Sequence, residues 1–464
     1  MIYNLMASCK HFCLHAGGLS DRMITIRMDR SGFIQIITGV IFTQNGDRIL
    51  NSSKAWTIKY ALLNMAYFAA FCTLHAYAAV YLLAQGFSNT EVGILLAVAN
   101  VVSAVCQPLV AGLIDKPGPL TNKNFIIISV SFIMAGSVLL MFVQNNKAVI
   151  FLVYALIYMI QFAYQPVMTA LCFEYRKAGC DIFYGLARGL GSAGFAVTSA
   201  FVGGMVEKKG VSVLLVVNTA MMMLSLIVIL MFKKPEAGSP DMINKEADND
   251  VRENGSEAAA SGEAHNNILE FARIYPAYTL FLLGVICIFF SHNMINDFMI
   301  QIIRDLGGAE TELGYSNFLQ AILELPVMAL IGLVLKRISA AKLLLFSGVA
   351  FFVKILILIF AKSMTAMYVS QSFQLFAYAV FIPAAAYYVN ETMEELDQVK
   401  GQAFITSSIT VGGVFSNLIS GTILDRLGVK PMLVTGTVVC ALGAVIAFIA
   451  FTALKHHRIP VTSE

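Results

Sequence analysis

The feature that most constrains this chain is a series of long apolar segments with few or no charges. A helix needs roughly 20 apolar residues to cross a hydrocarbon core about 30 Å thick. Only 13% of the 464 residues are charged, whereas soluble domains average about 25%. The sequence therefore predicts an all-α membrane protein with twelve transmembrane helices. The predicted spans are Thr57–Ala84, Val92–Ile114, Asn124–Val143, Ala148–Cys172, Phe183–Val206, Val211–Phe232, Ala277–Ile300, Leu313–Leu335, Leu343–Ala361, Thr365–Tyr388, Gln402–Leu424 and Pro431–Leu454.

A polar segment divides these spans into two blocks of six. Residues 233–268 are rich in Gly, Ser, Ala and Glu and contain no aromatic side chain. Such a segment cannot bury enough apolar surface to fold, so we expect a flexible linker. The expected domains are six-helix bundles at 51–232 and 269–455, with a tail at 456–464. Residues 1–50 are expected to be a disordered extension or to follow a misplaced start codon, with an amphipathic anchor as the alternative.

The two blocks also share a repeated pattern in their fifth helices. The matching positions are 218 residues apart, and they are Gly194 with Gly412, Gly203 with Gly421, Glu207 with Asp425, and Gly210 with Gly428. Glycines on a membrane helix allow a second helix to approach closely. Two similar six-helix units are the arrangement expected of a transporter that rocks one half against the other.

The distribution of Lys and Arg among the loops predicts the orientation of the chain. With the N-terminus inside, the inner loops hold thirteen basic residues and the outer loops hold seven. Because cytoplasmic loops carry the excess of Lys and Arg, we expect both termini and the linker to be cytoplasmic. The expected location is the cell membrane (inner or plasma membrane), which the chain crosses many times.

Several classes of function lack their sequence signals. The eight cysteines lie mostly singly in apolar runs, so we expect neither a metal site nor a disulfide framework. A net charge of +3 without a basic run argues against binding of nucleic acid. No phosphate-binding loop of the form GxxxxGK[ST] is present, which argues against direct ATP drive. No nucleophile and base pattern indicates an enzyme, and we expect no cofactor.

Three stretches of this sequence resemble one transporter family. The first is "TEVGILLAVANVVSAVCQPLVAGLIDKPG", Thr90–Gly118, the second is "YGLARGLGSAGFAVTSAFVG", and the third is Gly314–Ala361. They resemble helices two, five, eight and nine of the oligosaccharide–proton symporters, the lactose permease-like family of the major facilitator superfamily. The resemblance implies two six-helix bundles related by a pseudo-two-fold axis, and it implies secondary active transport.

Three charged residues lie inside predicted spans, where a charge is costly and marks function by default. Arg188 matches the family's substrate-binding arginine on helix five, so we expect it to anchor the solute. Glu324 lies in the middle of helix eight and is expected to bind the solute and carry the proton. Lys354 matches a family arginine of proton coupling and is expected to be the partner of Glu324. Asp297 is the second candidate proton carrier. An interfacial arginine and a structural glutamate are the alternatives.

The chain departs from the family at several positions of the sugar site. The family's helix-four carboxylate falls near Thr169, and its helix-eight carboxylate aligns with Ala321. Gln374 stands at the place of a helix-ten histidine, and Phe195 replaces a sugar-stacking tryptophan. These differences argue against lactose as the solute. We expect Phe195, Gln374 and Gln107 to contact the solute beside Arg188 and Glu324.

The predicted function is secondary transport of a small polar organic solute by alternating access, with proton symport. A sugar or glycoside, a nucleoside and an organic anion all remain open as solutes. Residues at helix ends, namely Asp115, Lys116, Gly118 and Asp425, are expected to act in gating. An exporter or facilitator is the alternative within the class, and a non-transporting membrane sensor is the alternative from another class. The expected partners are the solute, protons and the lipid bilayer, and the chain is expected to be a monomer.

Overall fold

The computed structural model describes residues 46–114, 118, 120–143, 146–233 and 268–453, without the side chains of 46–54, 328–329 and 395–396. The predicted extension up to residue 45, most of the linker and the C-terminal tail lie outside the described residues. The helices from Ser53 onward belong to one compact unit.

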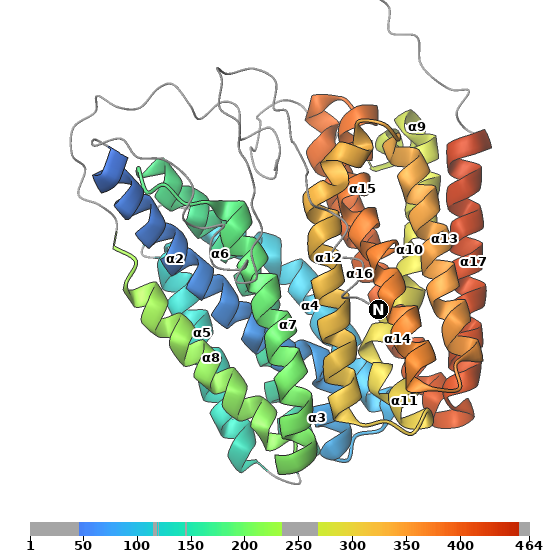
Figure 1. Ribbon diagram of the computed structural model, residues 1–464, viewed down its shortest axis with the longest axis horizontal. Helices are drawn as coiled ribbons and strands as arrows, with labels where there is room; N and C mark the ends of the chain where they lie inside the picture. The colour runs from blue at the N-terminus through green and yellow to red at the C-terminus, as the bar shows by residue number, and fades with distance from the viewer. Residues whose placement is uncertain (1–45, 115–117, 119, 144–145, 234–267, 454–464) are drawn as a thin grey trace, which may run out of the picture. The chain divides into compact units, whose positions relative to one another are not determined.

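All regular elements among the described residues are helices (Figure 1). Those of the first half are α2 (Gly46–Phe71), η3 (Cys72–Ala76), α3 (Ala78–Ala84), α4 (Asn89–Ile114), α5 (Asn122–Phe142), α6 (Lys147–Lys177), α7 (Tyr184–Lys209) and α8 (Ser212–Leu230). Those of the second half are α9 (Ile268–Ile274), α10 (Pro276–Asp297), α11 (Met299–Asp305), α12 (Glu310–Leu335), α13 (Ala340–Phe360), α14 (Met364–Ser372), η4 (Phe373–Leu375), α15 (Tyr378–Thr392), α16 (Glu395–Leu427) and α17 (Val429–Ala453). The short helix α9 was not predicted.

Eleven helical segments of the described residues are long and apolar enough to cross a membrane. They coincide with eleven of the twelve predicted spans. The remaining predicted span coincides with α12, a helix of 26 residues in which the side chains of residues 328–329 are not described. The prediction of an all-α membrane protein is therefore confirmed.

Three of the predicted spans contain an interruption that the sequence analysis did not predict. The first is interrupted by the π-helix η3, and the seventh by Phe298 between α10 and α11. The tenth is interrupted by the 3₁₀ turn η4, which contains Gln374. No proline or glycine stands at these positions, so the sequence carries no simple signal for the breaks. In transporters, interrupted helices are typical of the regions that bind solutes and ions.

Side chains satisfy backbone carbonyl groups beside two of the breaks. The Tyr154 hydroxyl donates to the Leu74 carbonyl at 2.6 Å, and the Thr73 hydroxyl donates to the Ala70 carbonyl at 2.8 Å. Beside η4, the Ser347 hydroxyl donates to the Ala377 carbonyl at 2.8 Å. Unpaired backbone groups are costly inside a membrane, so these bonds stabilise the irregular backbone.

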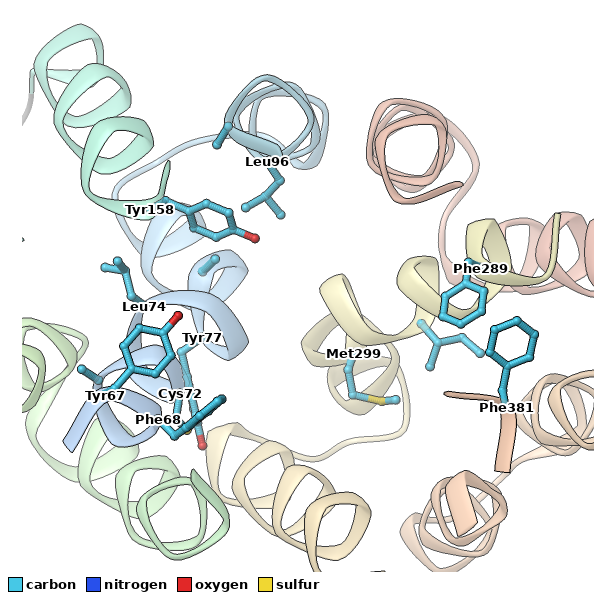
Figure 2. Close-up of a cluster of buried hydrophobic side chains, with 14 of the residues drawn as sticks. Tyr67, Phe68, Cys72, Leu74, Tyr77, Leu96, Tyr158, Phe289, Met299 and Phe381 are labelled. Atoms are coloured by element: carbon cyan, nitrogen blue, oxygen red, sulfur yellow. The ribbon is translucent and has the colours of Figure 1, made fainter. Parts of the chain in front are cut away.

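Buried aromatic rings make up much of the core, as Figure 2 shows for Tyr67, Phe289 and Phe381. The rings of Tyr67 and Tyr164 meet edge to face, with centroids 4.9 Å apart, and those of Phe289 and Phe381 with centroids 5.0 Å apart. The Tyr67 hydroxyl donates to the Gln161 carbonyl at 2.9 Å. Edge-to-face rings add to the stability gained by burial, and a bonded hydroxyl lets tyrosine be buried fully.

Two positions of the sequence repeat end equivalent helices. Gly210 follows α7 with φ of 84°, and Gly428 follows α16 with φ of 86°. Glycine adopts such a positive φ without the steric penalty of other residues. We call the end of the bundle at which α7 and α16 end the far end. We call the opposite end, at which α8 ends and α9 begins, the linker end.

Candidate functional site

A hydrogen-bonded network of buried polar side chains lies where α12, α13 and η4 meet. The Lys354 ammonium donates to the side-chain oxygen of Gln374 at 2.7 Å and to that of Gln320 at 3.3 Å. The side-chain amide of Gln374 in turn donates to Glu324 Oε1 at 2.8 Å. Lys354 is 1% exposed, so its charge depends on these partners. Gln374 thus separates the cation from the anion and bonds to both.

Arg188 on α7 acts on the same carboxylate from the other half of the chain. The Glu324 carboxyl interacts electrostatically with both Lys354 and Arg188. The Tyr378 hydroxyl also interacts with Glu324 and Arg188. The structure therefore places Lys354 and Arg188 within electrostatic range of Glu324, and among the described residues no hydrogen bond or ion pair joins Arg188 to it.

The Arg188 side chain rests on an aromatic ring of the first half. Its guanidinium carbon lies 4.1 Å from the centroid of the Phe68 ring, and Nη1 donates to the Ser192 hydroxyl at 3.3 Å. A cation over an aromatic face is attracted by the ring. These two contacts leave further guanidinium donors for a solute, because arginine carries five N–H groups.

Three other predicted site residues lie elsewhere. Asp297, at the end of α10, lies beside Asn417 of α16 and near Tyr158 of α6. Gln107 donates to Ser103 of its own helix at 3.4 Å. Phe195 is partly buried against the hydrophobic core. Within the described residues, no hydrogen bond or ion pair joins any of these three to the Lys354 network.

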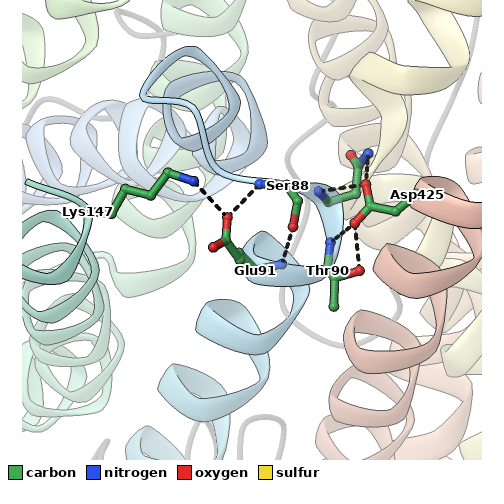
Figure 3. A network of polar contacts seen from close by, with 6 residues as sticks. Ser88, Thr90, Glu91, Lys147 and Asp425 are labelled. Atoms are coloured by element: carbon green, nitrogen blue, oxygen red, sulfur yellow. Dashed lines mark hydrogen bonds and ion pairs between the residues drawn. The ribbon is translucent and has the colours of Figure 1, made fainter. Parts of the chain in front are cut away.

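Asp425 binds the first turn of α4 at the far end (Figure 3). Its Oδ1 accepts from the backbone and side-chain amides of Asn89 at 3.1 and 2.8 Å. Its Oδ2 accepts from the backbone N–H and hydroxyl of Thr90 at 2.7 and 2.6 Å. The N-terminus of a helix presents unpaired N–H groups and a positive dipole end, so a carboxylate is stabilised there.

The repeat partner of Asp425 makes a related contact. Glu207 at the end of α7 accepts a hydrogen bond from the Thr311 hydroxyl in the first turn of α12. Both acidic residues of the repeat therefore join the two halves at the far end.

Four glycines allow these helices to touch backbone to backbone. A Cβ atom on Gly203 would collide with the carbonyl oxygen of Glu310, and one on Gly314 with that of Ser199. These two glycines form the contact, or seam, between α7 and α12. In the second seam, between α4 and α16, a Cβ on Gly421 would collide with the carbonyl of Asn89, and one on Gly93 with that of Asn417. α7 packs along α12 and α4 along α16 in this way.

The same helix faces separate towards the linker end. Gly185 and Gly203 are 18 residues apart on α7, which at about 3.6 residues per turn is about five whole turns. A Cβ on Gly185 would meet no described atom within 4 Å. On α12, a Cβ on Gly332, 18 residues after Gly314, would approach only the Tyr387 hydroxyl, at 3.9 Å. The α7–α12 seam is therefore closed at the far end and open at the linker end.

The remaining predicted gating residues, Asp115, Lys116 and Gly118, follow the end of α4. Asp115 and Lys116 lie outside the described residues. Gly118 is exposed in the segment between α4 and α5. Among the described residues, no group of His, Cys, Asp or Glu side chains could hold a metal ion.

A second sequence repeat marks the helices that Glu207 and Asp425 contact. The stretch "NTEVG" begins α4 and "ETELG" begins α12, and these copies are 221 residues apart. Thr90 and Thr311 occupy equivalent places in the two copies, as do Gly93 and Gly314. Sequence reasoning missed this repeat, although a search for self-similarity at a spacing close to 218 would have found it.

A comparison with protein families finds that the model of the MFS_1 like family matches residues 57–435. No curated protein matches the chain.

Solved transporter structures share the fold. The nucleoside transporter NupG is 13% identical, with a TM-score of 0.68, and the alignment covers 86% of this chain and 99% of that one. A peptide transporter of the POT family in an auto-inhibited form is 12% identical, with a TM-score of 0.64 and coverage of 87% and 98%. A bacterial homologue of the human lysosomal transporter Spinster, solved inward-facing and unoccupied, is 13% identical, with a TM-score of 0.60 and coverage of 86% and 97%.

Proposed function

The chain belongs to the MFS_1 like family, and from this premise we propose that it carries a small polar organic solute together with protons. Membership of this family makes the chain a multi-pass secondary transporter of the major facilitator superfamily and not an enzyme. The proposal adds proton symport by alternating access, with Arg188 as the solute anchor and Glu324 as the proton carrier.

The observation that carries the proposal is the network around Glu324. A carboxylate inside the membrane faces a lysine through Gln374 and an arginine from the opposite half. Protonation of Glu324 would change its bond to Gln374 and its attraction to both cations. Such a group links proton binding to the contacts between the two halves, which is what coupling requires.

The solute is proposed to be a sugar or glycoside, a nucleoside or an organic anion. Arg188 and Lys354 against Glu324 give the site a net charge of about +1, which favours an anionic group. The amides of Gln320 and Gln374 favour a solute with several hydrogen-bonding groups. Among the structural neighbours, NupG is a nucleoside transporter and the POT protein a peptide transporter, but at this identity the likeness supports the fold alone.

Finer assignments belong to the same proposal. Helices two, five, eight and nine support kinship with the lactose permease-like symporters. The excess of Lys and Arg in the inner loops supports cytoplasmic termini in a cell membrane, which places the linker end at the cytoplasm. Asp425 is proposed as a gating residue because it joins the halves at the far end, and Asp115, Lys116 and Gly118 are proposed for the opposite gate. We propose a monomer as the working unit.

Replacement of Glu324 tests the proposal. In proteoliposomes with an imposed pH gradient, the wild type should accumulate solute from a panel of sugars, nucleosides and aromatic acids. Glu324→Gln should lose accumulation but keep solute exchange, because a permanently neutral side chain no longer carries the proton. Glu391→Gln, an exposed glutamate near the end of α15, is the matched control and should accumulate solute normally.

The same vesicles distinguish the alternatives. A facilitator would equilibrate the solute without accumulating it, and an exporter would move it against the direction of the proton gradient. Unchanged accumulation by Glu324→Gln would show that this residue is not the carrier, and Asp297 would be examined next.

A further inference from the structure

A small groove lies on the outside of the first half at the far end. Its volume is about 260 Å³. The lining residues come from the start of α4 and the start of α6, and they are Phe87, Glu91, Ile94, Lys147, Ala148 and Phe151. The functions described above use none of these side chains.

The mouth of the groove carries one positive and one negative charge. Lys147 Nζ lies 3.2 Å from Glu91 Oε2, and the two side chains are 49% and 44% exposed. The same carboxylate oxygen accepts from the Ser88 backbone N–H at 2.8 Å. Within the described part of the chain, the other oxygen, Oε1, accepts no hydrogen bond. Figure 3 shows this network from Lys147 to Ser88.

The wall beneath the charges is apolar. Ile94 lies three residues after Glu91 on α4 and is 40% exposed, and Phe151 lies four residues after Lys147 on α6 and is half-buried. Residues three or four apart share one face of a helix, so each charge stands directly above an apolar side chain. Lys147 and Glu91 lie at the first turns of their spans, where we expect lipid headgroups.

We propose that this groove binds one phospholipid with a primary-amine headgroup, phosphatidylethanolamine. Its phosphate accepts a hydrogen bond from Lys147, and its ammonium donates to Glu91 Oε1. One acyl chain runs along Ile94 and Phe151. The ammonium thus faces the carboxylate and the phosphate faces the lysine. An exposed ion pair such as Lys147–Glu91 contributes little to stability, so a headgroup can insert at small cost.

The chemistry of the headgroup explains why the groove should prefer phosphatidylethanolamine to other phospholipids. Phosphatidylcholine carries a quaternary ammonium without N–H donors, so it cannot donate to Glu91. Phosphatidylglycerol has no cation, so it offers Glu91 only neutral hydroxyl donors and brings an uncompensated negative charge beside the carboxylate. The site also lies beside the contacts that close the far end, because Thr90, which binds Asp425, adjoins Glu91 in the first turn of α4 (Figure 3).

Native mass spectrometry of the full chain in detergent, with each lipid added in turn, tests the proposal. We expect one retained phosphatidylethanolamine per chain, and about tenfold weaker retention in Lys147→Gln, the size expected for one lost hydrogen bond to a charged group. Ala148→Trp, which fills the groove without removing a charge, should weaken retention as well. Lys209→Gln, an exposed lysine at the end of α7, is the control and should retain lipid as the wild type does.

Two results would overturn the assignment. One is equal retention of phosphatidylethanolamine by Lys147→Gln and Lys209→Gln. The other is retention of phosphatidylcholine as strong as that of phosphatidylethanolamine. Neither result depends on transport activity, so the lipid site and the proposed function are tested separately.

Discussion

The sequence predicts that Arg188 belongs to the site, but only the structure shows which side chains it contacts. Its position inside an apolar helix marks it as functional, and the structure gives it Phe68 beneath the guanidinium and Ser192 beside it. Glu324 is its electrostatic partner across the two halves. The roles proposed for the two residues make separate predictions.

Arg188→Ala should weaken solute binding at least about tenfold, because one or two charged hydrogen bonds are lost. Equilibrium binding to the purified protein measures this loss directly. Lys208→Ala, which removes a charge from the exposed end of the same helix, is the matched control. Wild-type affinity in Arg188→Ala would contradict the role of anchor.

Gln374 should be sensitive to the loss of its amide, because it bonds to a cation and an anion at once. Gln374→Leu keeps a similar size but leaves Glu324 without this donor and Lys354 with only Gln320. Breaking such a buried network costs about 3–5 kcal/mol when a charge is left uncompensated. We therefore expect a lower thermal unfolding temperature and lost accumulation. Adding Glu324→Gln should restore part of the stability, and strictly additive losses would argue against the network.

Close helix contacts decide at the element scale which end of the molecule is closed. α7 touches α12, and α4 touches α16, only because glycines stand at the crossings. The acidic residues Glu207 and Asp425 then bind the first turns of the facing helices. These contacts are short and local, so a single methyl group is enough to disturb them.

Gly203→Val should open the far end, because its side chain would overlap the Glu310 backbone. Spin labels at Lys209 and Asp305, on either side of this seam, should report a longer distance than in the unsubstituted chain. Gly185→Val places the same side chain on the same face of α7 but in open space, so its distance distribution should not change. Equal distributions for the two variants would show that the glycine contact does not hold the seam.

At the scale of the whole molecule, the α7–α12 seam is closed at the far end and open at the linker end, as the proposed alternating access requires of one of its two states. Transport then needs the far-end contacts to separate in each cycle. Two seams of similar construction, related by the sequence repeat, would have to open together.

A cross-link at the far end should therefore stop transport. Oxidation of the pair Asn89→Cys/Asp425→Cys, or of the pair Glu207→Cys/Thr311→Cys, should abolish uptake in proteoliposomes, and a reducing agent should restore it. Solute should still bind from the linker end of the locked protein. Uptake that continues in the oxidised pairs, with the single-cysteine variants as reference, would rule out rocking about this end.

The sequence by itself determined the membrane class, the positions of the spans but not all of their ends, the two-fold repeat and the three charges inside the spans. These are local or periodic properties: a run of apolar residues has the length of a bilayer whatever surrounds it, and an isolated charge in such a run is costly everywhere. The repeat even identified Gly203, Gly421 and the acidic residues of the seams, although not their partners.

Only the tertiary structure decided which of these groups meet. Gln374 was expected to touch the solute, and its place between Lys354 and Glu324 depends on the 3₁₀ turn that interrupts its helix. Asp297 carries the same kind of charge as Glu324 but lies beside Asn417. Such pairings depend on how helices distant in sequence cross, and a side chain's position along its own helix does not contain that information.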